Sequence, residues 1–578
     1  MKSVFRFVVP IVLCAALLGA AQSGGEAVQD LGVPSTNGLV VSTSGLASGA
    51  GAAILLKGGN AVDAAVATAF ALAVTLPSAG NIGGGGFMIV REVSGRAVAF
   101  DYRERAPLRS TPDMYLDEKG KIIRRLTDEG YLAPGVPGTV RGLELAHKRY
   151  GKLPWKEVLA PAVRLAGDGF VLSKSLANDL NRQLSGVMGK YPASVEAYGK
   201  PGGGKWVEGD RIILKDLAKT LAAIANEGPR VFYGGWIADR IAEDMKANGG
   251  LITKDDLAAY KAKVRKPVYG NYRGYEIISM PPPSSGGIAL IEMLNILENF
   301  HLNKNARYAP ETLHLTIEAM RRAYLDRARF LGDPDFGTVP VKKLISKQHA
   351  KEQAATINPA KASSSLALGK DIVTVPRETE SEKTTHFSVI DRNGMAVANT
   401  FTLEGGYGSR VVVKGAGFLL NNEMGDFNKK PGETNTTGDI GTKANLIEPG
   451  KRMLSSMTPT IVTRNGKVVL ITGSPGGRTI INTVLNIVLG VLEFGMNGRA
   501  AVDSPRLHHQ WLPDETIFER GAIPEEVQAR LKEMGHIIKM DKREGGQGDG
   551  NSILIDPASG VAYGINDKRS PDGKASKF

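Results

Sequence analysis

The sequence predicts a protein of the α/β class, with strands and helices layered around a common core. The chain has 578 residues, of which 42% are apolar and 70 are glycine, so it can bury one large core or several. Helical patterns recur in its first part, as a small-residue apolar segment at 59–76 and amphipathic segments at 287–300 and 312–331. From residue 384 onward, strand-like runs alternate with Asn-Gly and Asp-Gly turns, and one long apolar helix, TIINTVLNIVLGVLEFG, interrupts them. The change in style falls near residues 370–383.

The N-terminal segment has the pattern of an export signal. Lys2 and Arg6 precede an apolar run of roughly a dozen residues, which ends in small residues with a Gly19-x-Ala21 pattern. A membrane anchor is the alternative, but the run is short for a bilayer span and no charged stop follows it. The sequence therefore predicts a signal peptide over residues 1–21, cleavage after Ala21, and a periplasmic or secreted protein without stable membrane insertion.

Cysteine content and charge exclude several classes of site and partner. The single cysteine, Cys14, lies inside the signal, so the mature chain has no thiol for a disulfide, a metal site or a nucleophile. Loss of Lys2 and Arg6 with the signal lowers the net charge from +13 to +11, since residues 1–21 hold no acid. The remaining basic residues are dispersed, and the densest patch, EAMRRAYLDRARF, alternates with apolar residues as a solvated helix face does. Nucleic acid is therefore not an expected partner.

Four consecutive glycines, Gly83–Gly86, lead through GNIGGGGFMIV from the first predicted helix into a strand. Such glycines either let backbones crowd together in a tight turn or cradle a phosphate. No helix with a lysine follows them, so backbone crowding is the preferred interpretation. Pro-rich turns such as MPPPSSGG separate later elements.

The run THFSVIDRNGMAVANTFTL predicts a β-hairpin, because strand-like segments flank Asn393-Gly394. With these two residues at the centre of the turn, Thr385 lies opposite Thr402 and Thr384 opposite Leu403. Thr402 is therefore expected beside Thr384, within a register error of one or two residues.

A second hairpin is predicted in SSMTPTIVTRNGKVVLITGSPGG, with its turn at Asn465-Gly466. This register pairs Ser455 with Gly476 and Ser456 with Pro475, so two hydroxyls meet a Pro-Gly-Gly loop directly before the long apolar helix. Free backbone N–H groups at a helix entrance attract negative charge, and glycine permits a substrate to approach them closely. The loop GSPGG is thus either an oxyanion hole or a tight structural turn that needs glycine.

Two adjacent hydroxyl residues, Thr384 and Thr385, open the first hairpin in the stretch SEKTTHFSV. An ordinary polar lead into a strand explains them without chemistry, and a nucleophile is the alternative. No Ser-His-Asp spacing is readable nearby, and a strand histidine such as His386 more often packs than catalyses. A cut before Thr384 supplies a base, because the new α-amino group, with a reference pKa of about 7.7–8.0, can accept the hydroxyl proton. The polar segment KDIVTVPRETESEK is suited to such a cut.

Several motifs, in this order, resemble those of the γ-glutamyltransferases, also called glutathione hydrolases, of the N-terminal-nucleophile hydrolase group. They are DYRERAP (101–107), TTHFSV (384–389), NNEMGDF (421–427), LSSMTPTIV (454–462) and GSPGG (473–477). The resemblance implies an αββα four-layer sandwich and a precursor that cuts itself between Lys383 and Thr384. A large subunit of residues 22–383 and a small subunit of residues 384–578 then stay associated in one body.

The resemblance also implies the catalytic residues. Thr384 corresponds to the nucleophile, and Thr402 corresponds to the hydroxyl that hydrogen-bonds the new amino terminus. Gly476 and Gly477 match the oxyanion hole.

A further group is implied to bind the α-amino-acid head of the substrate. Arg103 matches the arginine that grips the α-carboxylate, and Ser455 and Ser456 match the serines that assist it. Glu423 and Asp426 match the groups that receive the ammonium. An arginine together with acids is also what a zwitterionic head requires on charge alone.

Two positions depart from the family pattern. Glu404, grouped here with the ammonium-binding acids, stands where some members carry asparagine and others an acid. Thr437 stands where one subset has a lid tyrosine, within the loop KKPGETNTTGDIGTKAN. The length of the loop favours a lid, without the tyrosine that latches it in that subset.

The implied function is that of a self-processed γ-glutamyl hydrolase and transferase. It attacks the γ-amide of glutathione and related compounds and passes the acyl group to water or to amino acid or peptide acceptors. No metal or cofactor is expected. Two alternatives stay open: a glutaryl-type cephalosporin acylase, separable by whether the substrate must carry an α-amino group, and a non-catalytic exported binding protein for γ-glutamyl compounds, which would have no use for a nucleophile.

Overall fold

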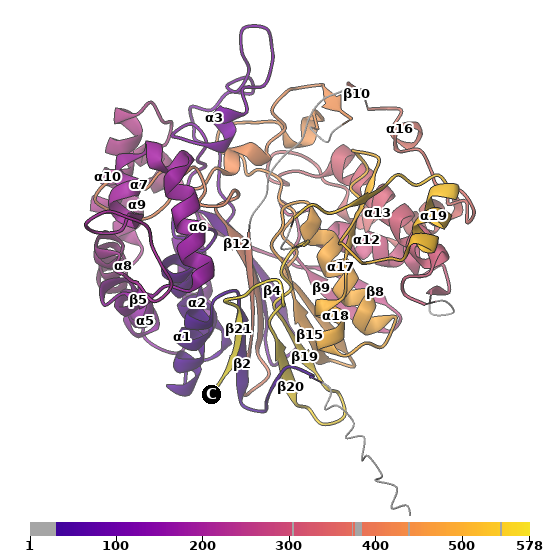
Figure 1. Ribbon diagram of the computed structural model, residues 1–578, viewed down its shortest axis with the longest axis horizontal. Helices are drawn as coiled ribbons and strands as arrows, with labels where there is room; N and C mark the ends of the chain where they lie inside the picture. The colour runs from indigo at the N-terminus through magenta and orange to yellow at the C-terminus, as the bar shows by residue number, and fades with distance from the viewer. Residues whose placement is uncertain (1–29, 303–305, 373, 376–383, 437–439, 544–545) are drawn as a thin grey trace, which may run out of the picture. The chain divides into compact units, whose positions relative to one another are not determined.

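Two seven-stranded antiparallel sheets lie face to face in the body formed by residues 31–578 (Figure 1). The first sheet has the order β21 (Lys574–Lys577), β2 (Gly38–Ser42), β11 (Thr385–Asp391), β12 (Ala396–Thr402), β3 (Gly85–Arg91), β4 (Ala97–Asp101) and β7 (Lys263–Arg265). The second has the order β1 (Val33–Ser35), β20 (Ala562–Ile565), β19 (Ser552–Ile555), β15 (Lys467–Thr472), β14 (Thr460–Arg464), β9 (Tyr275–Ser279) and β8 (Val268–Tyr272).

The computed structural model describes residues 30–302, 306–372, 374–375, 384–436, 440–543 and 546–578. The predicted signal peptide, the start of the predicted large subunit, Lys383 and Thr437 lie outside these residues. No helix in the described part of the chain combines the length and the apolarity needed to cross a bilayer.

Helices cover the outer face of each sheet and complete four layers (Figure 1). Over the first sheet lie α1 (Gly45–Leu56), α2 (Ala61–Thr75), α4 (Thr139–Tyr150), α5 (Trp155–Gly167) and α8 (Lys215–Glu227). Over the second lie α12 (Gly286–Leu297), α13 (Pro310–Phe330), α15 (Lys347–Ala355), α17 (Thr479–Leu492) and α18 (Gly498–Asp503). The αββα sandwich is therefore confirmed.

Smaller elements flank these layers. The helices are α3 (Arg125–Asp128), α6 (Lys174–Ser185), α7 (Pro192–Tyr198), α9 (Arg230–Gly234), α10 (Trp236–Ala247), α11 (Lys254–Ala259), α14 (Val341–Leu344), α16 (Ser365–Leu368), α19 (Glu525–Glu533) and the 3-10 turns η1 (Val187–Lys190), η3 (Glu423–Asp426) and η4 (Lys443–Asn445). The strands are β5 (Phe170–Val171), β6 (Arg211–Ile212), β10 (Thr374–Val375), β13 (Thr434–Asn435), β16 (Leu507–His508), β17 (Thr516–Phe518) and β18 (Ile538–Met540).

Alternation along the strands builds three apolar layers. In β2, Leu39 and Val41 pack between the two sheets, whereas Val40 faces the helices of the first layer. Ile461 and Ile471 fill the same inter-sheet layer from the second sheet. The sheets are thus held by side chains that interdigitate across a shared inner face, as in other stacked sheets.

Both sheets contain strands from before and after residue 384. β11 pairs with β2 on one side, β12 pairs with β3, and β14 pairs with β9, so the later strands lie directly against the earlier ones. The C-terminal strand β21 also pairs with β2. Neither part of the chain forms a complete sheet alone.

The three helices predicted from sequence are confirmed as α2, α12 and α13, and the long apolar helix is α17. The crowding predicted at the glycine run is confirmed as well. A Cβ on Gly84 would lie 2.1 Å from the carbonyl oxygen of Thr402, and one on Gly85 would lie 2.5 Å from that of Tyr102. Only glycine allows the start of β3 to lie this close to its neighbours.

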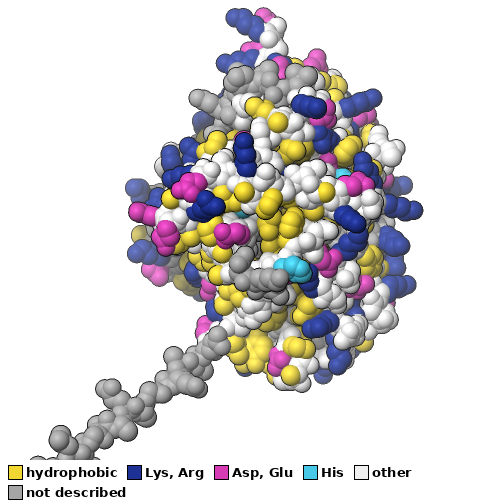
Figure 2. All heavy atoms as spheres, turned by 90° about the vertical axis from the view of Figure 1, so that its right-hand side faces the viewer, with side chains coloured by type: hydrophobic (Ala, Val, Ile, Leu, Met, Phe, Trp, Pro, Cys, Tyr) yellow, Lys and Arg dark blue, Asp and Glu magenta, His cyan; other side chains and the backbone are white. Residues whose placement is uncertain are grey.

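The basic patch of α13 differs from its predicted role as a solvated face. Arg321 and Arg322 are buried, and both contact the carboxylate of Glu318, at 3.1 and 2.6 Å. Glu318, one turn earlier on the helix, pairs with both guanidiniums, and Asp514 also pairs with Arg321, so two carboxylates compensate the two buried charges. Figure 2 shows the side of the molecule on which α13 and α19 lie in Figure 1, and lysine and arginine side chains there are scattered among acidic and apolar ones rather than gathered in one patch.

The first hairpin forms with a register one residue from the predicted one. Thr385 pairs with Phe401, not with Thr402. The cause is a three-residue loop in place of two: the side chain of Asp391 accepts hydrogen bonds from the N–H groups of Asn393 and Met395, at 2.9 and 3.1 Å, and Gly394 has φ of +88°.

The second hairpin has the predicted turn, since Arg464 pairs with Lys467 and both Asn465 and Gly466 have positive φ. A β-bulge between Val462 and Thr463 then shifts the register by one residue. β14 begins only at Thr460, after a proline that has no N–H to donate.

The predicted pairings of Ser455 with Gly476 and of Ser456 with Pro475 are therefore wrong. Ser455 instead forms a parallel bridge with Ser284.

Candidate active site

A cavity of about 370 Å³ lies where β11, β12, α13 and the entrance of α17 come together. Its wall contains most of the site residues predicted from sequence: Arg103, Thr384, Thr402, Glu404, Glu423, Asp426, Ser455, Ser456 and Gly477. Gly476 is the predicted residue that does not line it. Residues as far apart in the chain as Arg103 and Gly477 thus converge on one space.

Thr384 lies directly before β11 and is half-buried at the cavity wall. Because Thr385 pairs with Phe401, the next position of the same register sets Thr384 across from Thr402, the last residue of β12. Opposite residues of an antiparallel pair have Cβ atoms about 4.5–5.5 Å apart. Thr402 is buried, and its Oγ1 accepts a hydrogen bond from the N–H of Glu404 at 2.8 Å. The two hydroxyls therefore lie side by side, as expected from sequence despite the register error.

His386 lies between the two sheets rather than in the cavity. Its ring nitrogens contact Thr400 Oγ1 at 2.8 Å and Ser388 Oγ at 3.1 Å, and its side chain is fully buried. Burial lowers the pKa of His386 to about 3, so the ring is neutral at physiological pH. The packing interpretation of this histidine fits these contacts, and it supplies no base to Thr384.

The loop before α17 presents two glycine N–H groups at a helix N-terminus. Gly476 has φ of +125° and Gly477 has φ of +53°, so both adopt conformations that disfavour a side chain. Their carbonyls are used inside the turn, with Thr479 N–H donating to Gly476 O at 3.0 Å and Ile480 N–H to Gly477 O at 3.1 Å. Within the described part of the chain, neither glycine N–H has an acceptor. The positive end of α17 and these two donors can stabilise an anion.

Arg103 follows β4 and is fully buried. Its guanidinium pairs with the carboxylates of Glu423 and Asp426, which lie at the two ends of η3. It also donates to the main-chain carbonyls of Met453 and Leu454, each at 3.3 Å. Burial alone lowers the pKa of Arg103, but the facing carboxylates outweigh it and raise the pKa, so the side chain stays charged.

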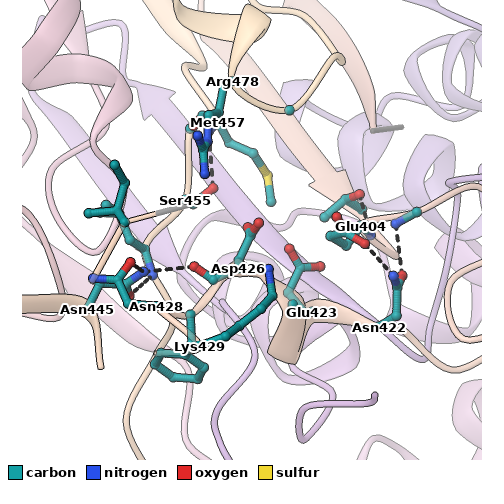
Figure 3. A pocket seen from close by; sticks show the side chains of 18 of the residues that line it. Glu404, Asn422, Glu423, Asp426, Asn428, Lys429, Asn445, Ser455, Met457 and Arg478 are labelled. Carbon is teal, nitrogen blue, oxygen red and sulfur yellow. Dashed lines mark hydrogen bonds between the residues drawn. The ribbon is translucent and has the colours of Figure 1, made fainter. Parts of the chain in front are cut away.

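Figure 3 shows Glu423 and Asp426 pointing into the same space, between Ser455 on one side and Glu404 on the other. Glu423 is buried, whereas the side chain of Asp426 is 37% exposed to the cavity. Burial raises the pKa of Glu423 well above its usual range, and the nearby acids add to this while Arg103 opposes it. The cavity therefore holds more carboxyl groups than one arginine can neutralise.

The two serines are held by their main chain and by neighbours from the large predicted subunit. Ser455 Oγ accepts a hydrogen bond from Met457 N–H at 3.1 Å, and its carbonyl accepts from Ser285 N–H at 2.8 Å. Ser456 Oγ accepts from Arg327 Nη2 at 3.1 Å. Both hydroxyl oxygens thus act as acceptors in these hydrogen bonds, so the hydroxyl hydrogens are not used in them.

Glu404 continues from β12 with φ of +77°, an uncommon conformation for a residue with a side chain. Its carboxylate accepts a hydrogen bond from the side chain of Asn422, whose own oxygen accepts from Gly405 N–H at 2.8 Å (Figure 3). The turn therefore carries an acid to the cavity wall opposite Ser455. Strain of this kind costs on the order of 1–3 kcal/mol and recurs at functional sites.

The loop at 429–445, in which a lid was expected, contributes Lys429, Lys430, Glu433, Ile440 and Thr442 to the wall of the cavity. Its strand β13 pairs in parallel with β10, and Thr442 Oγ1 donates to Ala328 O of α13 at 2.6 Å. The described part of the loop is thus attached to β10 and to α13 beside the cavity.

Sequence reasoning missed four residues around the cavity. Glu104 is fully buried, lies 3.6 Å from Arg103 Nη1, and has its pKa raised to about 7 by burial. It lies inside DYRERAP and Asn422 lies inside NNEMGDF, so the motifs contained them without singling them out. Tyr324 and Arg327 lie in the basic patch of α13, and their i, i+3 spacing places them on the same face of the helix, which was the only hint of a shared role.

Two buried clusters outside the cavity have side-chain atoms close enough to hold a metal ion. They are His314, Glu318 and His536, and Glu292, Asp326 and His349. Glu318 is already neutralised by two arginines, and His349 contacts Asp326 at 2.7 Å. Ion pairs and hydrogen bonds therefore already engage Glu318, Asp326 and His349.

Comparison with known proteins identifies the family. A family model described as gamma-glutamyltranspeptidase matches residues 47–577. The chain belongs to the γ-glutamyltranspeptidase family. A glutathione hydrolase proenzyme of Escherichia coli (strain K12) is 46% identical over 542 residues, which cover 93% of this chain and 92% of that protein.

Solved structures agree with this family. The γ-glutamyltranspeptidase of Helicobacter pylori is 48% identical, with a TM-score of 0.54 over 55% of this chain and 91% of its own. A cephalosporin acylase from Bacillus halodurans is 28% identical, with a TM-score of 0.82 over 97% of this chain and 99% of its own. The γ-glutamyltranspeptidase family assignment made from sequence motifs is therefore confirmed.

Proposed function

We propose that the protein is a self-processed γ-glutamyl hydrolase and transferase that acts on glutathione and related γ-glutamyl amides, with Thr384 as its nucleophile. The observation that carries this proposal is the register of the first hairpin, which sets Thr384 beside Thr402 at the wall of a cavity that also holds Arg103. Membership of the γ-glutamyltranspeptidase family supports the same activity, and relatives named as proenzymes support self-cleavage.

Maturation creates the catalytic base. A cut between Lys383 and Thr384 leaves Thr384 with a free α-amino group, which accepts the proton of its own hydroxyl. The neighbouring hydroxyl of Thr402, fixed by Glu404 N–H, hydrogen-bonds this amino group. The fully buried, neutral His386 is not needed.

The substrate head is recognised by charge. Its α-carboxylate binds Arg103 with the hydroxyls of Ser455 and Ser456, and its ammonium binds Glu423 and Asp426, with Glu404 nearby. Without substrate, Arg103 pairs with the acids themselves. A zwitterion inserted between them gives each charged group an opposite partner and leaves the net charge of the cavity unchanged.

The reaction then proceeds through an acyl-enzyme. Thr384 Oγ1 adds to the γ-carbonyl carbon while its proton passes to the α-amino group. The oxyanion that forms accepts hydrogen bonds from the N–H groups of Gly476 and Gly477. The tetrahedral intermediate collapses, the C–N bond breaks, and the amine leaves with the proton returned by the α-amino group. Water or the amine of an amino acid or peptide acceptor then attacks the ester and regenerates Thr384.

Glutaryl-amide hydrolysis is the second candidate, because a cephalosporin acylase shares the fold. A glutaryl group lacks the ammonium, so it would leave the buried Glu423 and the cavity-facing Asp426 without the partner that a γ-glutamyl group brings. A site built for a polar group rejects analogues that lack it far more strongly than an apolar pocket rejects a missing methylene.

The test is a comparison of kcat/KM for a γ-glutamyl anilide and the matching glutaryl anilide with the purified protein. We expect the γ-glutamyl compound to be favoured by at least about a hundred-fold, the effect of a few kcal/mol at an unmatched charged site. Equal values would defeat the γ-glutamyl assignment and favour the acylase. Binding without turnover of either compound would favour the non-catalytic binding protein.

Subunit association follows from the interleaved sheets. After the cut, the pairs β2–β11, β3–β12 and β9–β14 join residues of the large subunit, 22–383, to residues of the small subunit, 384–578. Separation would expose the inner strands of both sheets, so the two pieces stay together. The export signal read in residues 1–21 supports a periplasmic or secreted location.

A further inference from the structure

One face of α13 contacts two parts of the site, the pair Ser455 and Ser456 and the glycine turn before α17. Tyr324, Arg327, Ala328 and Leu331 follow the i, i+3, i+4, i+7 spacing that places side chains on one side of a helix. Arg327, Ala328 and Leu331 line the cavity. Tyr324 lies one turn earlier and contacts the loop that enters α17.

Arg327 supports the two serines at the same time. Its Nη2 donates to Ser456 Oγ at 3.1 Å and its Nε donates to Ser285 Oγ at 2.9 Å. Ser285 Oγ in turn donates to the carbonyl of Ser455 at 2.6 Å. A planar guanidinium offers such donors in a fixed fork, which an ammonium group cannot reproduce.

The direction of these hydrogen bonds has a chemical consequence. A serine hydroxyl has one hydrogen to donate and two lone pairs to accept with. Because Ser456 Oγ accepts from a charged donor, its own hydrogen is available for another group and is polarised toward it. Among the described residues, no acceptor for that hydrogen is found, so it is left for a carboxylate in the cavity.

Tyr324 holds the other half of the site. Its hydroxyl donates to the carbonyl of Arg478, the residue that follows Gly477 and caps α17. The ring is buried and meets His508 edge-on, with centroids 5.9 Å apart. Thr479 Oγ1 and N–H hold the carbonyl of Gly476 from the opposite side, at 2.7 and 3.0 Å. The turn that carries the two glycine N–H groups is therefore fixed at both ends.

The geometry points to Tyr324 and Arg327 as positioning residues for the reaction, an inference that rests on the proposed function. Arg327 orients Ser456, and through Ser285 the Ser455 main chain, toward the α-carboxylate of the substrate. Tyr324 orients the Gly476–Gly477 turn toward the oxyanion. One helix from before residue 384 thus positions the two serines and the oxyanion donors, all of which follow it in the chain.

The two roles predict different kinetic effects. The α-carboxylate is bound in both ground state and transition state, so Arg327→Gln should raise KM for a γ-glutamyl anilide roughly ten-fold and change kcat by less than about three-fold. The oxyanion exists only in the transition state, so Tyr324→Phe should lower kcat roughly ten-fold with KM within about three-fold. Arg327→Lys keeps the positive charge but lacks the forked donors, so its KM should lie between that of the unmodified protein and that of Arg327→Gln.

Matched controls separate positioning from general packing. Arg329→Gln removes an arginine two residues further along α13 that pairs with Asp371 and does not line the cavity. Tyr308→Phe removes another tyrosine hydroxyl that donates to a main-chain carbonyl, that of Pro505, at 2.8 Å. Both controls should keep KM and kcat within about two-fold of the unmodified protein.

The inference is overturned if Arg327→Gln and Tyr324→Phe match their controls, or if both change KM and kcat together in proportion to a lowered melting temperature. For each variant, KM and kcat for the γ-glutamyl anilide and the melting temperature are compared with those of the unmodified protein. Absence of turnover in the unmodified protein would instead defeat the proposed function, so the two failures are distinguishable.

Discussion

Arg103 forms ion pairs with two carboxylates from a fully buried position, so its charge affects both the stability of the site and the kind of ligand that the cavity binds. Loss of one partner from a buried pair leaves the other without compensation, which is more costly than never having the pair. In this site the uncompensated group would be Glu423, whose pKa burial already raises.

We expect Arg103→Ala to damage recognition and spare self-cleavage, because it removes the positive partner of the α-carboxylate and leaves Thr384 untouched. A lost charged hydrogen bond is worth about 1.5–3 kcal/mol, so kcat/KM for a γ-glutamyl anilide should fall roughly ten- to a hundred-fold or more. Arg105→Ala, two residues along the same motif and bonded to Gly450 O, is the matched control. Unchanged kinetics in Arg103→Ala would place the carboxylate elsewhere.

The acids of the cavity are expected to differ in importance. Asp426 pairs directly with Arg103, whereas Glu404 accepts a hydrogen bond from the neutral side chain of Asn422. Asp426→Asn should therefore lower kcat/KM for the γ-glutamyl anilide and narrow its advantage over the glutaryl anilide. Glu404→Asn should be tolerated better. A larger loss in Glu404→Asn than in Asp426→Asn would show that the ammonium binds at the Glu404 end of the cavity.

Among the elements, α12, α13 and α15 are joined by the buried His349, which contacts Glu292 and Asp326. Hydrogen bonding to Asp326, and then to Glu292, raises the pKa of His349 to about 9, and Arg329 lies 3.6 Å from the other oxygen of Asp326. The folded-state pKa is above the reference value of about 6.5, so this contribution to stability is complete below pH 6.5 and is lost as the pH rises through 9.

His349→Gln should consequently lower the free energy of unfolding most at acidic pH, by about 1.5–3 kcal/mol for a charged hydrogen bond. The gap in melting temperature between the unmodified protein and the variant should be widest near pH 6 and should shrink by pH 9.5. His301→Gln, at an exposed histidine, serves as the control. A gap that stays constant with pH would mean that the histidine acts only through packing.

The exact register of the hairpin strands could not be predicted from the sequence, because it depends on the length of the turn and on bulges. The Asn393-Gly394 signal located the first hairpin, but the Asp391 side chain lengthened its loop by one residue, and that choice depends on local hydrogen bonds. The bulge after Val462 likewise carries no sequence signal of its own. Helices with strong apolar patterns, such as α2 and α17, were predicted to within a few residues because burial on all sides decides them.

The pairing of Arg103 with Glu423 and Asp426 could not be predicted from spacing, since more than 300 residues separate them and only the folded sandwich brings them together. The family motifs identified each of these residues as a site residue but did not indicate that they pair with one another. The contacts of Tyr324 and Arg327 were likewise hidden within a patch that reads as a solvated helix face, because sequence does not reveal which side of a helix a distant loop will cover.

At the scale of the whole molecule, the two parts of the chain are interleaved in both sheets. Thr384 is the first residue of the second part and lies at the cavity wall, next to the strand that ends at Thr402. One cut at this point can therefore create an active site without dismantling the sandwich. The central claim is that Thr384 is both the residue that makes the cut and the nucleophile it sets free.

Intact mass measurement and N-terminal sequencing of the purified protein, compared with Thr384→Ala and Thr384→Ser, test this claim most directly. We predict two chains, residues 22–383 and 384–578, with the smaller beginning Thr-Thr-His-Phe. Thr384→Ala should remain one chain and be inactive on γ-glutamyl anilides, and Thr384→Ser should retain part of both reactions. An active protein that remains a single chain, or normal cleavage in Thr384→Ala, would contradict the account.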